Sequence, residues 1–272
     1  MNTLKKRGEL IARGRTAEIF TWSENQVLKL FYDWVAPESV YREFENTRQA
    51  SQAGAAVPQV FEVNHQGNRH GIVYELVSGP TMLQGLISKP WKVKQLSREL
   101  ADLHFSIHQI PFDGMTSYRD RWLSDIEQVP DLPVAVKEKL IAVVLQIPEG
   151  NQLCHFDFHP DQVVYSQRGA VILDWMTATR GNPAADIART QILLTIGKPP
   201  DSSWWLGILA GILGNLANYY YQERYLELNP AITKEMIRTW LSPMAAVRLL
   251  EKIEHEAPRL IKIIRKHTNE RC

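Results

Sequence analysis

Residues 153–175 read LCHFDFHPDQVVYSQRGAVILDW, and this stretch decides the fold. Two apolar runs, QVVY and AVIL, flank a polar turn at residues 166–169, which predicts a β-hairpin. Asp157 precedes the first strand, Gln162 begins it and Asp174 follows the second, so we expect these side chains at one end of the hairpin. Two carboxylates and an amide oxygen suit a hard cation such as Mg²⁺. Magnesium held in this way is typical of phosphoryl transfer.

Composition and charge place the chain among ordinary folded proteins. Its 272 residues are 44% hydrophobic and 22% charged, which allows a large core in one domain or in two lobes. The net charge of +1 indicates neither a nucleic acid nor an acidic membrane surface as partner, and no obligate protein partner is evident. The two cysteines, Cys154 and Cys272, argue against a disulfide framework or a cysteine zinc site. Together with an N-terminus that lacks a signal-peptide pattern, they favour the cytoplasm.

The most apolar run, WWLGILAGILG at residues 204–214, is too short for a membrane span. It stops at Asn215, whereas a helix needs roughly 18 to 20 apolar residues to cross a bilayer. We therefore expect a buried helix here.

The first 77 residues predict a strand-rich region with one helix. Two β-like runs flank a turn at residues 13–16, and the apolar strand VLKLF follows them. We expect the helix at residues 37–53 and two further strands at residues 59–64 and 71–77.

Lys29 and Glu43 are the charged residues of this region that need an explanation. Lys29 interrupts an apolar strand, so it either faces solvent or meets an anion. Glu43 lies on the predicted helix and is either an exposed acid or the partner of Lys29.

Ser78-Gly79-Pro80 is the strongest candidate for a domain boundary. Strands dominate before it and helices after it, and such a change of class indicates two lobes joined by a connector. We predict an N-terminal lobe at residues 1–77, a hinge at 78–80 and a helical lobe at 81–272.

Helical periodicity organises the second lobe. It predicts helices at residues 92–109 and 134–146, and a third that begins near Ala184. The chain from residue 201 onward is expected to be helical. Short breaks are predicted at Asn229-Pro230, Ser242-Pro243 and Pro258.

Two histidines and one aspartate stand out on these helices. His104 and His108 are four residues apart, a spacing that can share a metal ion, but no HExxH arrangement accompanies them and we favour a structural role. Asp186 falls in the first turn of its helix, where a carboxylate accepts backbone N–H groups. We expect it to brace the neighbouring turn.

Together these features resemble the aminoglycoside phosphotransferase and choline kinase family, the small-molecule branch of the protein-kinase-like fold. The most specific part is HFDFHPDQVV followed by VILDW, which is similar to the family's H-G-D-F-H-P-x-N run and its I-D-W run. The similarity extends from about residue 8 to about residue 200. It implies an α+β, two-lobed fold with a small antiparallel sheet and one helix in the N-lobe and a larger, mainly helical C-lobe.

The resemblance implies roles for individual residues. Asp157 matches the catalytic aspartate, Gln162 stands in place of a magnesium-binding asparagine, and Asp174 matches the metal-binding aspartate. Lys29 looks like the phosphate-binding lysine, and Glu43 like its ion-pair partner.

It also implies nucleotide contacts and support for the catalytic loop. The segment GIVYELVSG resembles the hinge that reads adenine, with the Glu75 carbonyl and the Val77 N–H as contacts. The place of the phosphate-covering loop is taken by Gly14, Arg15 and Thr16. Support of the catalytic loop is expected from His155, His159 and Asp186.

Four positions depart from the family pattern. Gln162 is one methylene longer than asparagine, which displaces a ligand by about 1 Å in a site that wants near-octahedral geometry. Phe156 replaces a glycine, and Met176 stands where many members have an acid. The phosphate-covering loop has a single glycine, Gly14.

These observations lead to two hypotheses of function. The first is a Mg²⁺-dependent kinase that transfers the γ-phosphoryl group of ATP or GTP to a hydroxyl of a small molecule. The second is a catalytically degenerate nucleotide-binding or regulatory module, which the Gln162 and Met176 departures motivate. A protein kinase is disfavoured because D-F-G and A-P-E stretches are missing.

No motif identifies the acceptor. Contacts to it are expected from residues 117–147 and 201–225, and the latter segment has only two acids, Asp201 and Glu223. That scarcity argues mildly against a polycationic antibiotic. Aromatic residues that can stack a sugar or a quaternary amine, or simply pack in the core, are Trp204, Trp205, Tyr219, Tyr220 and Tyr221.

Overall fold

The computed structural model of the protein describes residues 7–112, 114, 117–130, 132–197 and 204–268. Its contacts divide the chain into two compact units. The first consists of the chain up to Met82 together with Asp161–Ala178, and the second of Leu83–Pro160 together with the chain from Thr179 onward. The first unit contains an antiparallel sheet and the second is mainly helical, which confirms the predicted α+β class.

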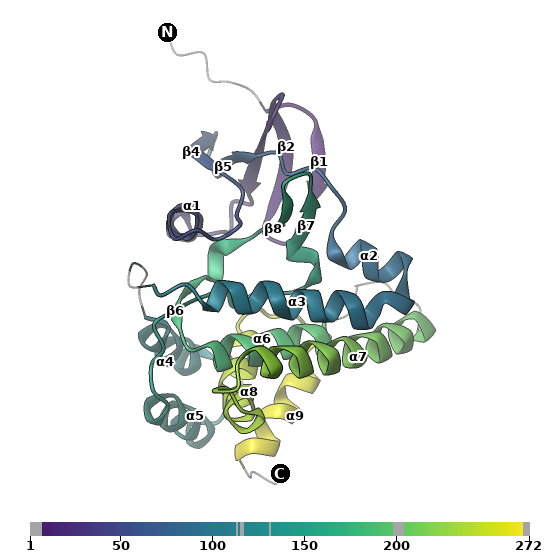
Figure 1. Ribbon diagram of the computed structural model, residues 1–272. Helices are drawn as coiled ribbons and strands as arrows, with labels where there is room; N and C mark the ends of the chain where they lie inside the picture. Colours follow the sequence, from purple (N-terminus) through teal and green to yellow (C-terminus); the bar gives the residue numbers. More distant parts are fainter. Residues whose placement is uncertain (1–6, 113, 115–116, 131, 198–203, 269–272) are drawn as a thin grey trace. The chain divides into compact units, whose positions relative to one another are not determined.

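The sheet of the first unit has five antiparallel strands in the order β1-β2-β3-β5-β4 (Figure 1). The inner strands β3 and β5 are buried on both faces, because one face belongs to an apolar cluster with Val27 and Tyr74 and the other to a cluster with Leu28 and Val73. The predicted end of the last strand is wrong, because β5 ends at Glu75 and leaves Val77 beyond it. The elements are β1 (Leu10–Arg13), β2 (Ala17–Ser23), β3 (Gln26–Phe31), α1 (Pro37–Gln52), β4 (Val60–Gln66) and β5 (Arg69–Glu75).

The alternation of side chains along β3 explains where Lys29 points. Val27 and Phe31 belong to the apolar cluster that also contains Val40 of α1. Successive side chains of a strand lie on opposite faces, so Lys29 shares the face of Val27 and Phe31 and points toward α1. Its side chain is 13% exposed, which excludes the solvent-facing alternative.

The predicted hairpin is confirmed, with both strands displaced by one residue: β7 is Val163–Ser166 and β8 is Gly169–Ile172. Backbone hydrogen bonds join it to the first unit, because Tyr165 N donates to Pro80 O (3.0 Å) and Ile172 N donates to Ala56 O (2.7 Å). The hairpin therefore groups with the sheet, whereas the predicted division had placed all of residues 81–272 in one lobe. A 3₁₀ turn, η3 (Trp175–Thr177), follows the hairpin.

The rest of the chain forms helices and one short strand pair. The apolar stripe predicted for α3 is buried, as its residues Leu96, Leu100 and Ile107 show. The helical elements are α2 (Met82–Ser88), η1 (Pro90–Lys92), α3 (Val93–His108), α4 (Tyr118–Gln128), α5 (Val134–Gln146), η2 (Pro160–Gln162), α6 (Pro183–Ile196), α7 (Trp204–Leu228), α8 (Lys234–Leu249) and α9 (Ala257–Thr268). The strand pair is β6 (Gln152–Cys154) with β9 (Thr179–Gly181).

Two helices differ from the sequence-based prediction. The α4 helix was not predicted, although Ser117 caps it by accepting a hydrogen bond from Arg119 N (3.2 Å). The predicted break at Ser242-Pro243 is wrong, because α8 continues through Pro243. A proline inside a helix removes one hydrogen bond and crowds the preceding turn, at a cost of about 3 kcal/mol. Here the buried Trp240 and Met244 on either side offset that cost by packing in the core.

The apolar run in α7 is less buried than predicted. Ile208, Leu209 and Ile212 are all exposed, and Ile212 is 60% exposed. The expectation of a buried helix is therefore wrong for this face. Among the described residues, none of the helices combines the length and the hydropathy that a membrane crossing requires.

Candidate active site

A buried charge cluster lies where β3 and α1 meet the end of the hairpin. Lys29 Nζ is 2.6 Å from Glu43 Oε1 and 3.1 Å from Asp174 Oδ1. Tyr74 on β5 donates its hydroxyl to the same Glu43 oxygen at 2.8 Å. Glu43 is fully buried, whereas Asp174 keeps 32% of its side chain exposed. The cluster thus has a buried carboxylate that holds the lysine and an accessible one beside it.

The electrostatics of this cluster keep the lysine charged. Burial by itself lowers the pKa of the Lys29 ammonium, but the carboxylates of Asp174 and Glu43 outweigh burial and raise that pKa above its ordinary value. Burial raises the pKa of Glu43, and the Lys29 ammonium opposes that rise. The charged ammonium can therefore donate hydrogen bonds to an anion such as a phosphate.

Of the three residues expected at one end of the hairpin, Gln162 and Asp174 lie there, whereas Asp157 belongs to the other unit. Leu173 N donates to Gln162 O at 2.8 Å, which ties Gln162 to the residue that precedes Asp174. Asp174 itself has a left-handed backbone (φ 60°, ψ 68°). A carboxylate and an amide oxygen are donors that Mg²⁺ accepts, so the chemistry of this donor set fits the predicted metal.

The residues expected to contact a nucleotide belong to the same unit. Gly14, Arg15 and Thr16 connect β1 to β2, and Gly14 N donates to Ala17 O at 2.8 Å to close a tight turn. Glu75 ends β5, and its carboxylate accepts hydrogen bonds from Gln59 N (3.0 Å) and from Arg168 (2.7 Å). Its side chain is thereby held by the residue before β4 and by the turn of the hairpin.

Asp157 belongs to the second unit, in a loop that Asp186 of α6 holds by its backbone. Asp186 accepts hydrogen bonds from His155 N (2.6 Å) and from Phe156 N (2.9 Å). The Asp186 carboxylate therefore supports the loop that carries Asp157, as the family resemblance implied, whereas its place in the helix had predicted that it braces the neighbouring turn at residues 181–183. His155 contributes as well, because its Nδ1 accepts from Asp157 N at 3.2 Å.

Two further residues of α6 hold the carbonyl groups of this loop. Arg189 Nε donates to Phe156 O at 3.2 Å, and Thr190 Oγ1 donates to Phe158 O at 2.9 Å. The Asp157 side chain itself is partly exposed, with His159 Nε2 3.8 Å from its Oδ2. Sequence analysis missed Arg189 and Thr190, although both lie one helical turn after Asp186 on the same face.

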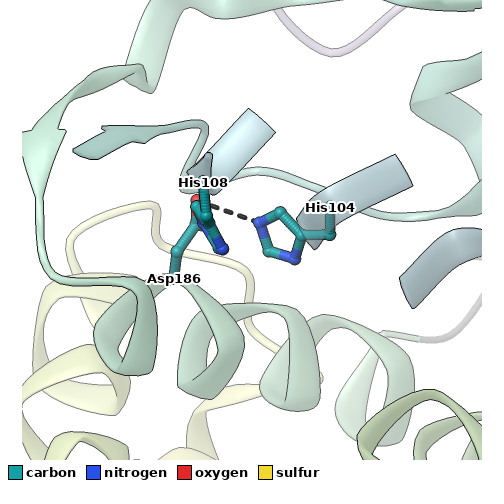
Figure 2. Close-up of side chains that lie close together, drawn as sticks. All are labelled: His104, His108 and Asp186. Carbon is teal, nitrogen blue, oxygen red and sulfur yellow. Dashed lines mark hydrogen bonds and ion pairs between the residues drawn. The ribbon is translucent and has the colours of Figure 1, made fainter. Parts of the chain in front are cut away.

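Asp186 is in turn surrounded by the two histidines of α3. Figure 2 shows the three side chains together: His104 Nε2 is 3.0 Å and His108 Nε2 is 3.2 Å from Asp186 Oδ2. The other ring nitrogens face α7, since each Nδ1 is 2.6 Å from a tyrosine hydroxyl, that of Tyr221 for His104 and that of Tyr225 for His108. Each ring thus faces Asp186 with its Nε2 and a tyrosine hydroxyl with its Nδ1.

The charge in this network resides on Asp186. Burial lowers the pKa of His104 to about 4, so its imidazole is neutral at neutral pH. Burial raises the pKa of Asp186, but the two histidines outweigh it and hold that pKa well below its ordinary value. Burial also raises the pKa of Tyr221 and Tyr225, which keep their hydroxyl protons. A neutral His104 that faces Asp186 with Nε2 and the Tyr221 hydroxyl with Nδ1 supports the structural role favoured for the histidine pair.

Phe156 has an unusual backbone for its residue type. Its φ is +57°, in the left-handed region where glycine is the ordinary residue, as in the family motif. The ring is buried against Trp122 of α4 (4.6 Å between ring centroids), and Tyr118 lies 6.2 Å away. Aromatic packing against α4 thus accompanies the replacement of glycine.

Met176 is a packing residue. It lies in η3 and contacts the apolar cluster that contains Phe31 and Val40. At the position where the resemblance leads us to expect an acid, this chain therefore has a side chain that packs against the core.

Only part of the expected acceptor region is described. Tyr221 is buried in the histidine network, whereas Tyr219 is 57% exposed. The side chains of Trp204 and Trp205, as well as Asp201, lie outside the described residues.

Comparison with known proteins matches the chain to a protein family. A sequence model of the phosphotransferase enzyme family matches residues 9–225. None of the curated protein sequences compared with the chain matches it.

Several solved structures have the same fold. A thermostable mutant of aminoglycoside phosphotransferase APH(4)-Ia is 16% identical over 97% of both chains, with a TM-score of 0.66. It has also been solved as a ternary complex with AMP-PNP and hygromycin B. Amicoumacin kinase hAmiN, in complex with AMP-PNP, Ca²⁺ and Ami, is 14% identical over 98% of this chain and 90% of that one, with a TM-score of 0.61. These similarities confirm the predicted two-lobed, kinase-like fold.

Proposed function

Because the chain belongs to the phosphotransferase enzyme family, we propose that it transfers the γ-phosphoryl group of ATP or GTP to a hydroxyl of a small molecule. The observation that carries this proposal is the buried pair of Lys29 and Glu43 with the accessible carboxylate of Asp174 at 3.1 Å from the lysine. A lysine held in this way beside an oxygen ligand is the arrangement that phosphoryl transfer requires.

Each residue has a separate part in the proposed reaction. Lys29 donates hydrogen bonds to the α- and β-phosphates, and Glu43 keeps its ammonium in place. Asp174 and Gln162 offer oxygens to Mg²⁺, which when bound neutralises charge that develops on the phosphoryl group. Asp157 orients the acceptor hydroxyl and receives its proton.

The nucleotide contacts are part of the same proposal. The Glu75 carbonyl and the Val77 N–H bind the adenine edge, and the turn at Gly14, Arg15 and Thr16 covers the phosphates. The complexes of APH(4)-Ia and hAmiN with AMP-PNP support a nucleotide. For the acceptor, these complexes support a small molecule and nothing more specific. At 14–16% sequence identity, a similar structure shows a common fold but not a common substrate.

We propose a cytoplasmic location, for which the buried free thiol of Cys154 is the supporting observation. The acceptor is a metabolite or an antibiotic with a free hydroxyl. The scarcity of acids in residues 201–225 remains an argument against a polycationic antibiotic.

A turnover assay tests the proposal. The purified protein is incubated with Mg²⁺ and ATP or GTP and a panel of hydroxylated metabolites and antibiotics, and release of the nucleoside diphosphate is followed. We expect acceptor-dependent release in the wild type and none with Asp157→Asn. Undiminished turnover with Asp157→Asn would remove Asp157 from the mechanism.

A nucleotide-binding module without turnover is the second candidate. Gln162 and the core position of Met176 favour it, since both leave the metal with fewer well-placed oxygens. Binding of Mg²⁺ and ATP without release across the whole panel would support the module. If Gln162→Asn raises turnover, the metal site is only weakened by the longer side chain.

A further inference from the structure

We propose that Asn46, a residue of α1 with no part in the family motifs, positions the metal carboxylate of Asp174 and thereby sets the strength of Mg²⁺ binding. The inference rests on the proposed function, because it takes Asp174 as a magnesium ligand. Asn46 is 5% exposed, and its side-chain amide donates to Trp175 O at 3.0 Å and to Ala178 O at 2.9 Å.

The two carbonyl groups bracket the turn that follows Asp174. They belong to the first residue of η3 and to the residue that caps its end. Asp174 is the residue immediately before η3, and its backbone is left-handed, a conformation that costs free energy in a residue with a Cβ and that neighbouring contacts can stabilise. Holding η3 therefore holds the backbone from which the Asp174 carboxylate projects.

The same helix reaches Asp174 by a second route. Glu43 and Asn46 are three residues apart on α1, so they lie on one face of the helix. Glu43 binds Lys29, which contacts the Asp174 carboxylate, and Asn46 binds the backbone just beyond it. Thus α1 fixes both the side chain and the main chain of Asp174.

An asparagine suits this position because both of its amide hydrogens have an acceptor. An aspartate has nearly the same shape but no donor, and it would place negative oxygens against two buried carbonyl groups. Asn46→Asp should therefore loosen η3 and misplace Asp174, while Lys29 and Glu43 keep their ion pair.

The experiment measures how much Mg²⁺ strengthens nucleotide binding. The dissociation constant of the full-length protein for a non-hydrolysable ATP analogue is determined by calorimetry, once with saturating Mg²⁺ and once with a chelator. The ratio of the two constants is the magnesium-linked gain. We expect Asn46→Asp to lower this gain about tenfold and to change the metal-free constant little.

A matched control is available on the same helix. Ala50 lies one turn after Asn46 and is also buried, and Ala50→Gly weakens α1 without removing a side-chain hydrogen bond to η3. Its magnesium-linked gain should equal that of the wild type. Asn46→Ser, which has no added charge, serves if the aspartate variant does not fold, and should lower the gain several-fold.

The possible results separate this role from the proposed function. A folded Asn46→Asp or Asn46→Ser variant with the wild-type gain would overturn the role of Asn46 and leave the kinase proposal intact. The role of Asn46 is also overturned if the substitution weakens nucleotide binding equally with Mg²⁺ and with the chelator, because an equal loss indicates general destabilisation. If the wild type shows no gain from Mg²⁺ at all, the magnesium site itself is wrong, and the role of Asn46 falls with it.

Discussion

At the scale of single residues, two opposing effects determine how much Phe156 contributes to stability. Its left-handed backbone costs about 1 to 2 kcal/mol in a residue that has a Cβ. Its buried ring, packed against Trp122, contributes more, because removing a buried phenylalanine side chain costs about 3 to 5 kcal/mol. Burial therefore outweighs strain, and this chain tolerates a large side chain where its family has glycine.

This balance predicts an unusual order of stability. Phe156→Gly should lower the free energy of unfolding by about 2 kcal/mol or more, because lost burial exceeds relieved strain. Phe156→Ala loses the ring and keeps the strain, so it should be about 1 kcal/mol less stable than the glycine variant. Urea unfolding measures both values. A glycine variant as stable as the wild type would contradict the account.

At the scale of elements, α6 supports the loop that carries Asp157. Asp186, Arg189 and Thr190 lie on one face of it and bind three consecutive parts of the loop that carries Asp157. The histidines of α3 contact Asp186, and the tyrosines of α7 contact the histidines. A chain of buried contacts from the Asp186 carboxylate therefore links three helices.

The neutral His104 predicts a pH dependence of stability. Its pKa is about 4 in the folded protein against 6.5 ordinarily, so between these values the unfolded chain binds the proton that the folded chain does not. Stability should therefore rise with pH through this window and fall as pH drops through it, by about 3 kcal/mol in total.

Substitution isolates this contribution. His104→Gln removes the titrating ring, so its free energy of unfolding should depend less steeply on pH between 4 and 6.5, although the variant is less stable overall. His255→Gln, the same substitution at an exposed position, is the control. Urea titrations at several pH values provide the measurement, and equal slopes for the wild type and His104→Gln would refute the assignment of a neutral His104.

At the scale of the whole molecule, the proposed site residues are divided between the two units. Lys29, Glu43, Gln162 and Asp174 belong to the first unit, because the hairpin groups with the sheet. Asp157 belongs to the second. Nucleotide binding and orientation of the acceptor hydroxyl should therefore be separable by mutation.

Ligand-induced stabilisation tests this separation. A nucleotide at 100 times its dissociation constant stabilises a protein by about 2.7 kcal/mol. We expect Mg²⁺ and an ATP analogue to raise the melting temperature of Asp157→Asn as much as that of the wild type. The rise should be much smaller for Asp174→Asn. Loss of the rise in both variants to the same extent would show that binding is not confined to the first unit.

The amino-acid sequence by itself determined the features that depend on nearby residues. The hairpin, the strand that contains Lys29 and the amphipathic helix at residues 92–109 all follow from apolar periodicity and turn residues. The helix through Pro243 was mispredicted for the same reason, because local rules do not include the burial of its neighbours.

Only the tertiary structure decided between the alternatives that the sequence left open. It turned Lys29 toward Glu43 instead of solvent, surrounded the His104 and His108 pair with Asp186 and tyrosines, and brought Asn46 to the turn after Asp174. Asn46 and Trp175 are 129 residues apart in the chain. Contacts at such separations depend on how whole elements pack, and periodicity reports which face of an element is apolar but not what lies against it.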